Sequence, residues 1–125
     1  KIKQIKMEEV MTNKEIVRKV NEGFNSGDNE TILKYVADDV TWECPGFFLH
    51  KGKEAFRKEI NNEAFMGLPV ITITNELEDG DLVAVEGNVK RKKKDGSDFS
   101  CRFFDFYRLE EGKIKEMRSY LVDIK

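Results

Sequence analysis

The 125-residue chain has few of the residues from which metal, redox and nucleotide sites are built. It contains one histidine, His50, and two cysteines, Cys44 and Cys101, which are not spaced as a CxxC pair. A single histidine excludes most histidine-based metal clusters, and no zinc-site spacing occurs. The GxxxxGK[ST] and GxGxxG patterns that cradle phosphates are also missing. We therefore expect neither a metal nor an organic cofactor.

Long apolar runs and a surplus of charge are missing as well. No stretch approaches the roughly 20 apolar residues of a membrane helix, and no apolar region or cleavage site follows the basic start KIKQIK. The formal net charge is −2, which gives no overall attraction to nucleic acid or anionic lipid. Two cysteines at this spacing favour free thiols in a reducing cytoplasm. We predict a cytoplasmic protein with no membrane and no nucleic-acid partner.

The length predicts one domain with one core. Residues 1–11 form an N-terminal extension or a leader, with Met7 or Met11 as an alternative natural start, and the domain covers residues 12–125. Thr12 and Glu15 fit a capping box that begins a first helix, and Gly27 suits the left-handed position that ends it. Asp28 can cap a second helix. The apolar residues assigned to that helix are Ile32, Leu33, Val36 and Val40.

The rest of the chain changes from helix to strand patterns. VTWEC (40–44) predicts a short strand, PGFFLHKG (45–52) a loop, and residues 53–66 a third helix stopped by Gly67 and Pro69. Four alternating segments follow, at 70–78, 82–92, 99–109 and 114–124. Turns separate them, including Asp95-Gly96, a strong hairpin signal. Three helices followed by antiparallel strands indicate an α+β fold whose curved sheet wraps around the helices and leaves a conical cavity.

Four stretches in this order carry a family resemblance: FNSGD (24–28), YVADDVTWECPG (35–46), KGKEAF (51–56) and FDFYRLEEGKI (104–114). From Thr12 onward the chain resembles the NTF2-like superfamily, which includes ketosteroid isomerase and the SnoaL-like polyketide cyclases. The resemblance implies an NTF2-like (cystatin-like) cone, in which three N-terminal helices pack on a strongly curved, mostly antiparallel sheet. It also implies a pocket between sheet and helices, and commonly a dimer formed through the outer sheet face.

The likeness to ketosteroid isomerase extends to particular residues. The position of that enzyme's catalytic base, just before a proline, is Cys44, and the position of its oxyanion tyrosine is Val20. Its protonated aspartate matches Asp105. Because only one of the three groups is kept, we do not expect steroid isomerisation by the same mechanism. Cys44 either packs in the pocket wall or takes part in chemistry or ligand contact.

Strand parity assigns the remaining candidates. If Asp105 faces the pocket, so do Cys101, Phe103, Tyr107 and Leu109. Phe104 and Phe106 then face outward, where a second subunit would cover them, so a homodimer is expected. Asp105 is either an acid–base group or the partner of an arginine such as Arg118. If Glu86 also faces inward, the two carboxyls share one proton; otherwise it faces solvent.

Two further features have open alternatives. His50 is either an acid or base in a loop at the pocket mouth, or a plain surface residue. Tyr107 is the better candidate of the two late tyrosines for hydrogen-bonding a ligand oxygen. The run KRKKKDG (90–96) predicts a solvated hairpin tip that blunts an edge strand, and the alternative is an anion or nucleic-acid contact.

The sequence as a whole predicts a SnoaL-like protein that binds a hydrophobic small molecule. Acid–base catalysis beside a carbonyl (isomerisation, cyclisation or dehydration) would use Asp105, Glu86, His50 and Tyr107. The predicted ligand-binding residues are Trp42, Cys44, Phe47, Phe65, Phe103, Met117, Ser119 and Leu121. The alternative is a non-catalytic ligand-binding or dimerising module, because the same fold hosts both kinds of protein.

Overall fold

The computed structural model describes residues 11–124. Within them the helices are α2 (Asn13–Ser26), α3 (Asn29–Lys34) and α4 (Lys53–Ile60), and the strands are β1 (Val36–Cys44), β2 (Phe48–Lys51), β3 (Phe65–Asp79), β4 (Leu82–Lys93), β5 (Asp98–Glu110) and β6 (Lys113–Asp123). The predicted α+β class is confirmed. Residues 1–10 of the predicted extension lie outside the described residues, whereas Met11 packs against the core.

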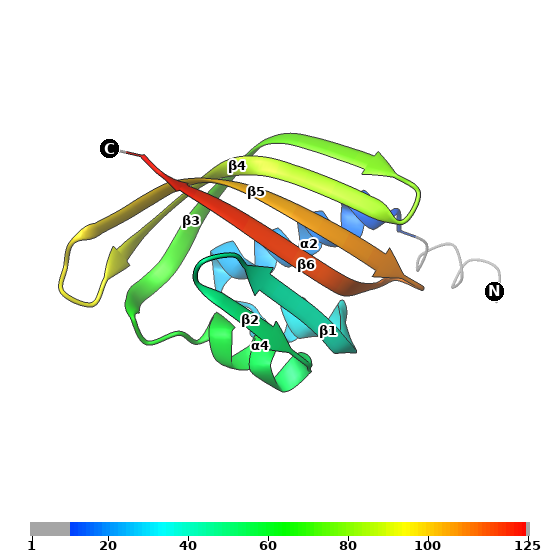
Figure 1. The fold of residues 1–125 in the computed structure, drawn as a ribbon, viewed down its shortest axis with the longest axis horizontal. Coiled ribbons are helices and arrows are strands. Elements are labelled where there is room, and N and C mark those ends of the chain that lie inside the picture. The colour runs from blue at the N-terminus through cyan, green and yellow to red at the C-terminus, as the bar shows by residue number, and fades with distance from the viewer. Residues whose placement is uncertain (1–10, 125) are drawn as a thin grey trace.

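The strands of the described residues form one sheet in the order β2-β1-β6-β5-β4-β3. The β1–β6 pair is parallel, and the other neighbours are antiparallel. The sheet curves around the helices but stays open, with β2 and β3 at its two edges (Figure 1). Helix α2 lies behind β5 and β6 in this view, and α4 lies beside β1 and β2. The helices therefore lie on the inner side of the curved sheet (Figure 1).

Helix α2 begins and ends where the sequence predicts. The Thr12 hydroxyl accepts from the Glu15 backbone N–H at 3.1 Å, and the Glu15 carboxylate accepts from the Thr12 N–H at 2.8 Å. Gly27 ends the helix with φ 74°, a left-handed conformation that glycine adopts without steric cost. The buried stripe of α2 includes Ile16, Val17 and Val20, which anchor the helix in the core.

The predicted second helix is too long. Helix α3 ends at Lys34, and Val36 and Val40 are buried residues of strand β1. Residues four apart lie on one face of a helix and also on one face of a strand. The spacing of these two valines therefore fits both structures, and pairing with β6 decides for the strand.

Two further predictions between residues 45 and 69 are wrong. The segment predicted as a loop contains β2, which pairs antiparallel with β1 after a turn at Gly46. The third helix ends at Ile60, and Gly67 and Pro69 lie within β3. Proline is tolerated there because β3 is an edge strand, whose N–H groups need no partner on the open side. The β3–β4 register shifts between Met66 and Val70.

Candidate active site

The inner faces of β5 and β6 form one wall of a cavity. Along β5, every second residue from Cys101 to Leu109 is buried, as strand parity predicts. The inward residues that are buried are Cys101, Phe103, Asp105, Tyr107 and Leu109 on β5, with Met117 and Ser119 on β6. Leu121 follows on the same face and is half-buried. The shared inward face predicted for the β5 residues is confirmed, and the three β6 residues, which were predicted to bind a ligand, lie on the same side.

Asp105 is the buried carboxyl group of this wall, with 7% of its surface exposed. The strand register places it between Val85 of β4 and Ser119 of β6. Its Oδ2 accepts a hydrogen bond from the Tyr107 hydroxyl at 3.1 Å, and Ser119 supplies a second side-chain hydrogen bond. Burial raises the pKa of Asp105 to about 6, because the loss of water outweighs these two hydrogen bonds. A carboxyl group in this state can accept or release a proton near neutral pH.

Asp105 has polar support on two sides. Trp42 donates its Nε1–H to Ser119 Oγ at 3.1 Å, which fixes the hydroxyl beside the carboxyl. Tyr107 is fully buried and also hydrogen-bonds with Asn21 of α2. Burial raises the pKa of Tyr107 well above its ordinary value, so the phenol keeps the proton that it donates to Asp105. Asn21, Tyr107, Asp105, Ser119 and Trp42 thus form one connected hydrogen-bond network.

Asp105 opens onto a cavity of about 110 Å³, called here the inner cavity. Its walls are mostly apolar. They comprise Asn21, Phe24, Trp42, Ile71, Val89, Phe103, Asp105, Met117 and Ser119. In these surroundings the ionised carboxylate has no water shell to stabilise it, which is the cause of the raised pKa.

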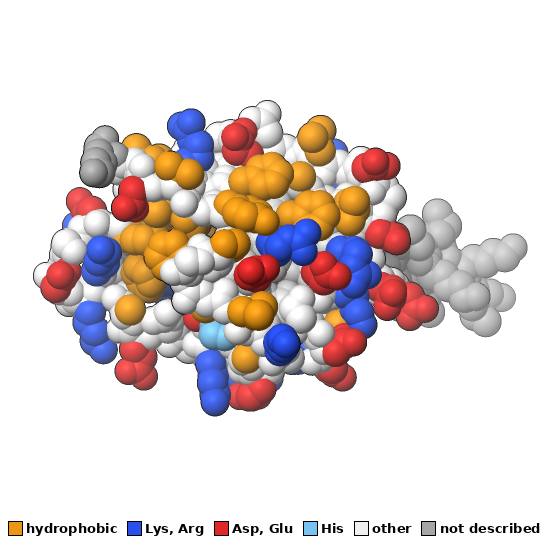
Figure 2. Space-filling view, viewed as in Figure 1, with side chains coloured by type: hydrophobic (Ala, Val, Ile, Leu, Met, Phe, Trp, Pro, Cys, Tyr) orange, Lys and Arg blue, Asp and Glu red, His pale blue; other side chains and the backbone are white. Residues whose placement is uncertain are grey.

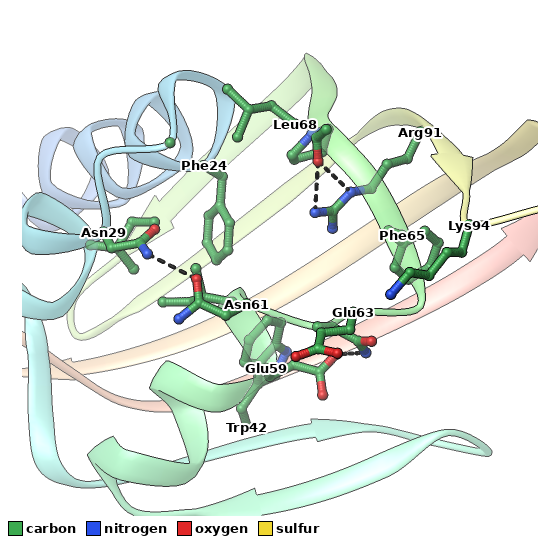
Figure 3. Close-up of a pocket in the computed structure, with 16 residues that line it drawn as sticks. Phe24, Asn29, Trp42, Glu59, Asn61, Glu63, Phe65, Leu68, Arg91 and Lys94 are labelled. Atoms are coloured by element: carbon green, nitrogen blue, oxygen red, sulfur yellow. Dashed lines mark hydrogen bonds between the residues drawn. The ribbon is translucent and has the colours of Figure 1, made fainter. Parts of the chain in front are cut away.

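Two wider hollows adjoin the inner cavity and share wall residues with it. The mouth hollow, of about 550 Å³, shares Phe24 and Trp42 with it (Figure 3). The side hollow, of about 400 Å³, shares Val89 with it. The two hollows also share Phe65 and Arg91, so the three spaces lie next to one another, and we call them together the funnel, with the small inner cavity at the Asp105 end.

The structure brings all of the predicted ligand-binding residues to this funnel. Trp42, Phe103, Met117 and Ser119 line the inner cavity, and Cys44, Phe47, Phe65 and Leu121 line the side hollow. Phe47 lies at the outer end, with 69% of its surface exposed in the turn between β1 and β2.

Cys44 is a buried wall residue. Burial raises its pKa to about 11, with the negative charges of Asp105 and Glu59 adding to the shift. The nucleophilic form of cysteine is the thiolate, and this environment keeps Cys44 as the thiol. Cys44 therefore contributes apolar surface to the side hollow.

Three of the four predicted catalytic residues do not line the funnel. Glu86 lies on the outer face, opposite Phe104 in the ladder, and accepts from Asn75 Nδ2 at 2.9 Å. It does not share a cavity with Asp105. Tyr107 is enclosed behind Asp105, to which its hydroxyl is committed, so it does not face a ligand.

His50 belongs to strand β2 and not to a loop at the pocket mouth. Its ring stacks on Phe48 with centroids 4.5 Å apart, and its Nε2 lies 2.8 Å from Glu59 Oε1. The predicted alternative partner of Asp105, Arg118, lies on the outer face over the Phe106 ring and pairs with Glu116 at 3.2 Å. Asp105 alone of the predicted acid–base set faces the inner cavity.

Several residues of the funnel were not identified from the sequence. Asn21 follows Val17 by four residues on the buried stripe of α2, where a polar residue is unexpected. A polar residue on this buried stripe was the signal from which Asn21 could have been identified as a site residue. Arg91 was hidden in a run of lysines, although it shares the parity of inward-facing Val89.

The described residues contain no group of three or more histidine, cysteine, aspartate or glutamate side chains that could hold a metal ion. None of the helices between residues 11 and 124 is both long and apolar enough to cross a membrane.

Comparison with solved structures identifies the fold class as NTF2-like. An NTF2-like protein of unknown function from Burkholderia pseudomallei has 20% identity and a TM-score of 0.81, with 90% of this chain and 92% of that chain covered. An LEH-like epoxide hydrolase from M. tuberculosis has 16% identity and a TM-score of 0.79, covering 88% and 82% of the two chains. TerC, co-crystallised with polyporic acid, has 22% identity and a TM-score of 0.78, covering 88% and 91%.

The family to which the chain belongs is identified by sequence comparison. The model of the SnoaL-like domain family matches residues 17–117, so the chain belongs to this family. No curated protein matches the sequence.

Proposed function

We propose that the protein is a cofactor-independent acid–base enzyme acting beside a carbonyl of a hydrophobic small molecule. The observation that carries the proposal is Asp105, a buried carboxyl at the narrow end of an apolar funnel with a pKa raised to about 6. Functional acids and bases are often found where burial shifts a pKa toward the working pH. Isomerisation, cyclisation and dehydration all need such a proton transfer.

Asp105 would take a proton from the carbon beside the carbonyl and return it to another atom of the same molecule. The carboxylate is the base and the resulting carboxylic acid is the donor, so the group is regenerated in each turnover. Tyr107 and Ser119 act as positioning residues, since their hydrogen bonds hold the carboxyl in one orientation. Trp42, Phe103 and Met117 would exclude water from the reacting atoms.

The solved relatives support a pocket function through their printed descriptions. One is described as an epoxide hydrolase, and TerC was crystallised with polyporic acid. A protein with a ketosteroid isomerase-like fold from Catenulispora acidiphila was solved with trimethylamine. These ligands and activities belong to those proteins and differ from one another, so we use them only as support for a ligand-binding funnel.

The test is exchange of carbon-bound protons with D2O, followed by proton NMR. 2-Tetralone and a set of aromatic β-ketoesters serve as probes, because their acidic protons lie beside a carbonyl. Wild-type protein should accelerate exchange, and Asp105→Asn should lose the acceleration. Asp79→Asn, at the exposed end of β3, is the matched control and should behave as wild type. Equal exchange with wild type and Asp105→Asn would refute the proposal.

A non-catalytic ligand carrier is the second candidate. The observation that favours it is the side hollow of about 400 Å³, whose walls include Cys44, Phe47 and Leu121 but not Asp105. A ligand held there would not need the carboxyl. Binding of a probe without any proton exchange would support this function over catalysis.

We also propose that the protein works as a homodimer in the cytoplasm. The outer sheet face carries exposed apolar side chains on several strands: Leu77, Leu82, Phe104, Tyr120 and Val122. Figure 2 shows hydrophobic side chains gathered over the sheet on the side away from α2. A second copy would remove this area from water, at about 25 cal/mol per Å². The two buried free thiols suit a reducing compartment.

A further inference from the structure

Arg91 is the one residue of the run KRKKKDG that lines the funnel's mouth and side hollows together. Its neighbours Lys90 and Lys92 are exposed, whereas Arg91 is half-buried. Its guanidinium lies 4.8 Å over the Phe65 ring, and its Nε and Nη2 both donate to the Gly67 carbonyl, at 3.3 and 3.0 Å. These contacts hold the cation on the same side of the mouth hollow as Phe65, across from Phe24 (Figure 3).

The Arg91 guanidinium has N–H donors that make no hydrogen bond within residues 11–124. Among residues 11–124 no acidic side chain forms a salt bridge with it. Arginine carries five N–H donors, and the two N–H groups named above share a single acceptor. Burial lowers the pKa of Arg91, because the charged form loses water there. The charge of Glu59 counters part of this shift without forming a salt bridge. A half-buried cation without a directly paired anion is costly, and an anionic ligand would offset that cost.

The acidic groups near the mouth do not supply this partner. Glu59 lines both wide hollows, but its Oε1 lies 2.8 Å from His50 Nε2 and its Oε2 accepts from Asn62 at 2.9 Å. Glu63 and Lys94 also line the mouth hollow, and Lys94 adds a second positive charge on the side of Arg91 (Figure 3). Glu59, one of the two carboxylates that line the mouth hollow, is therefore already bonded on both oxygens, and the other, Glu63, forms no salt bridge with Arg91.

Arg91 and Asp105 lie toward opposite ends of the funnel. Arg91 pairs with Phe99 of β5, six residues before Asp105 on that strand. At about 3.3 Å per residue, their backbone positions are roughly 20 Å apart along the sheet. Between them the wall is apolar, with Val89, Phe103 and Leu121 facing inward. The arrangement fits a molecule with an apolar body and one charged end.

We propose that the funnel selects amphipathic carboxylates: the apolar body lies along the sheet, the carboxylate binds Arg91, and the reacting end points toward Asp105. Arginine suits this role because its planar N–H donors match the two oxygens of a carboxylate. The inference names the substrate class of the proposed function and rests on it for the use of the funnel, but binding alone can test it.

The experiment is calorimetric titration with biphenyl-4-carboxylate and with biphenyl-4-carboxamide, a neutral probe of nearly the same shape, at pH 8. Wild type should bind the acid about tenfold more tightly than the amide, as expected for one charge-assisted bidentate contact near a surface. In Arg91→Met the two affinities should become equal through loss of acid binding. Lys90→Met, which removes an adjacent outward charge, should keep the wild-type ratio.

Two readouts keep the result interpretable. Unchanged amide affinity in Arg91→Met shows that the funnel is intact, and Arg91→Lys, which keeps the charge, should recover part of the preference for the acid. The same acid-to-amide ratio in Arg91→Met and wild type, or no binding of the acid to wild type, would overturn the inference. Selectivity without proton exchange would refute only the proposed catalysis, and proton exchange without selectivity would refute only the role of Arg91.

Discussion

The Tyr107 hydroxyl donates to Asp105 Oδ2 over 3.1 Å, from two residues further along the same strand. Residues two apart on a strand share a face, so both side chains point inward, yet only Asp105 reaches the inner cavity. Tyr107 is enclosed behind it, with Asn21 at its hydroxyl. The phenol therefore fixes the orientation of the carboxyl and favours its ionised form against the effect of burial.

The titration of Asp105 should make the free energy of unfolding depend on pH. Its folded pKa of about 6 lies above the ordinary 3.8, so protonation favours the folded state. The stability that this group contributes is full below pH 4 and is lost as the pH rises through 6. At about 1.4 kcal/mol per pKa unit, the loss is roughly 3 kcal/mol. Asp105→Asn, which cannot ionise, should gain that much relative to wild type between pH 4 and pH 8.

Urea unfolding at the two pH values measures this difference, and carboxyl NMR of wild type reports the pKa directly. Asp79→Asn should show no such gain, because this aspartate is exposed at the end of β3. Parallel pH profiles for wild type and Asp105→Asn would mean that Asp105 is solvated in the folded protein.

Replacing Tyr107 by phenylalanine should raise the pKa of Asp105 further. The substitution removes a hydrogen bond that lowers this pKa, while the burial that raises it remains. Losing the bond should also cost about 1 kcal/mol of stability. Any proton-exchange activity that needs the carboxylate should then rise at a higher pH than in wild type. Tyr120→Phe is the matched control, since Tyr120 is exposed on the outer face; an identical shift in that variant would contradict a local cause.

Local patterns were sufficient to predict the wall that carries Asp105. The alternation along FSCRFFDFYRL predicted which side chains share a face with Asp105, and the burial of Phe103, Asp105 and Tyr107 agrees with it. The same kind of reasoning was wrong for Val36 and Val40, whose spacing fits a helix and a strand equally. Only pairing with β6, a contact distant in sequence, decides between the two.

The rest of the site depends on such distant contacts. The first residues of β3, Phe65 and Met66, follow a helix-forming segment and become strand because they pair with β4. Phe65 and Gly67 in turn hold the Arg91 guanidinium. The sequence shows a run of positive charges, and nothing local distinguishes the one residue whose side chain turns into the funnel. Glu86 illustrates the same limit, because its face depends on the register between β4 and β5.

Both cysteines should resist alkylation in the folded protein. Burial raises the pKa of Cys44 and of Cys101 to about 11, from an ordinary 9.0. At pH 8 the thiolate fraction is then roughly 100-fold lower than for an exposed thiol. Iodoacetamide labelling followed by mass spectrometry should be slow for both residues and become fast in urea. Rapid native labelling of Cys44 would show that its thiol reaches solvent and would reopen a chemical role for it.

Gly87 is required by the close approach of three strands. A Cβ at this position would collide with the Thr72 carbonyl oxygen and would lie 2.9 Å from Phe103 Cζ. Because the first of these atoms is backbone, the collision cannot be relieved by a rotamer change, and Phe103 would move into the inner cavity. Gly87→Ala should cost about 3 kcal/mol, measured by urea unfolding. Asn88→Ala, its outward-facing neighbour, should cost far less; equal losses would argue against the steric cause.

The outer face of the sheet should be the dimer interface. Phe104 is 43% exposed there, beside Tyr120 in the ladder between β5 and β6. In a two-fold dimer each substitution acts twice, so a charge placed at this position is buried in both subunits. Phe104→Lys should therefore be monomeric by sedimentation velocity at about 100 μM protein, with an unchanged circular dichroism spectrum.

Leu49→Lys is the control for this prediction, because Leu49 is exposed on the edge strand β2, three strands away from β5 in the sheet. It should leave the dimer intact. A monomeric wild type at the same concentration would show that the apolar outer face is not covered by a second copy. If Leu49→Lys dissociates the dimer and Phe104→Lys does not, the interface lies at the β2 edge, and Phe104 is exposed in the assembly as well.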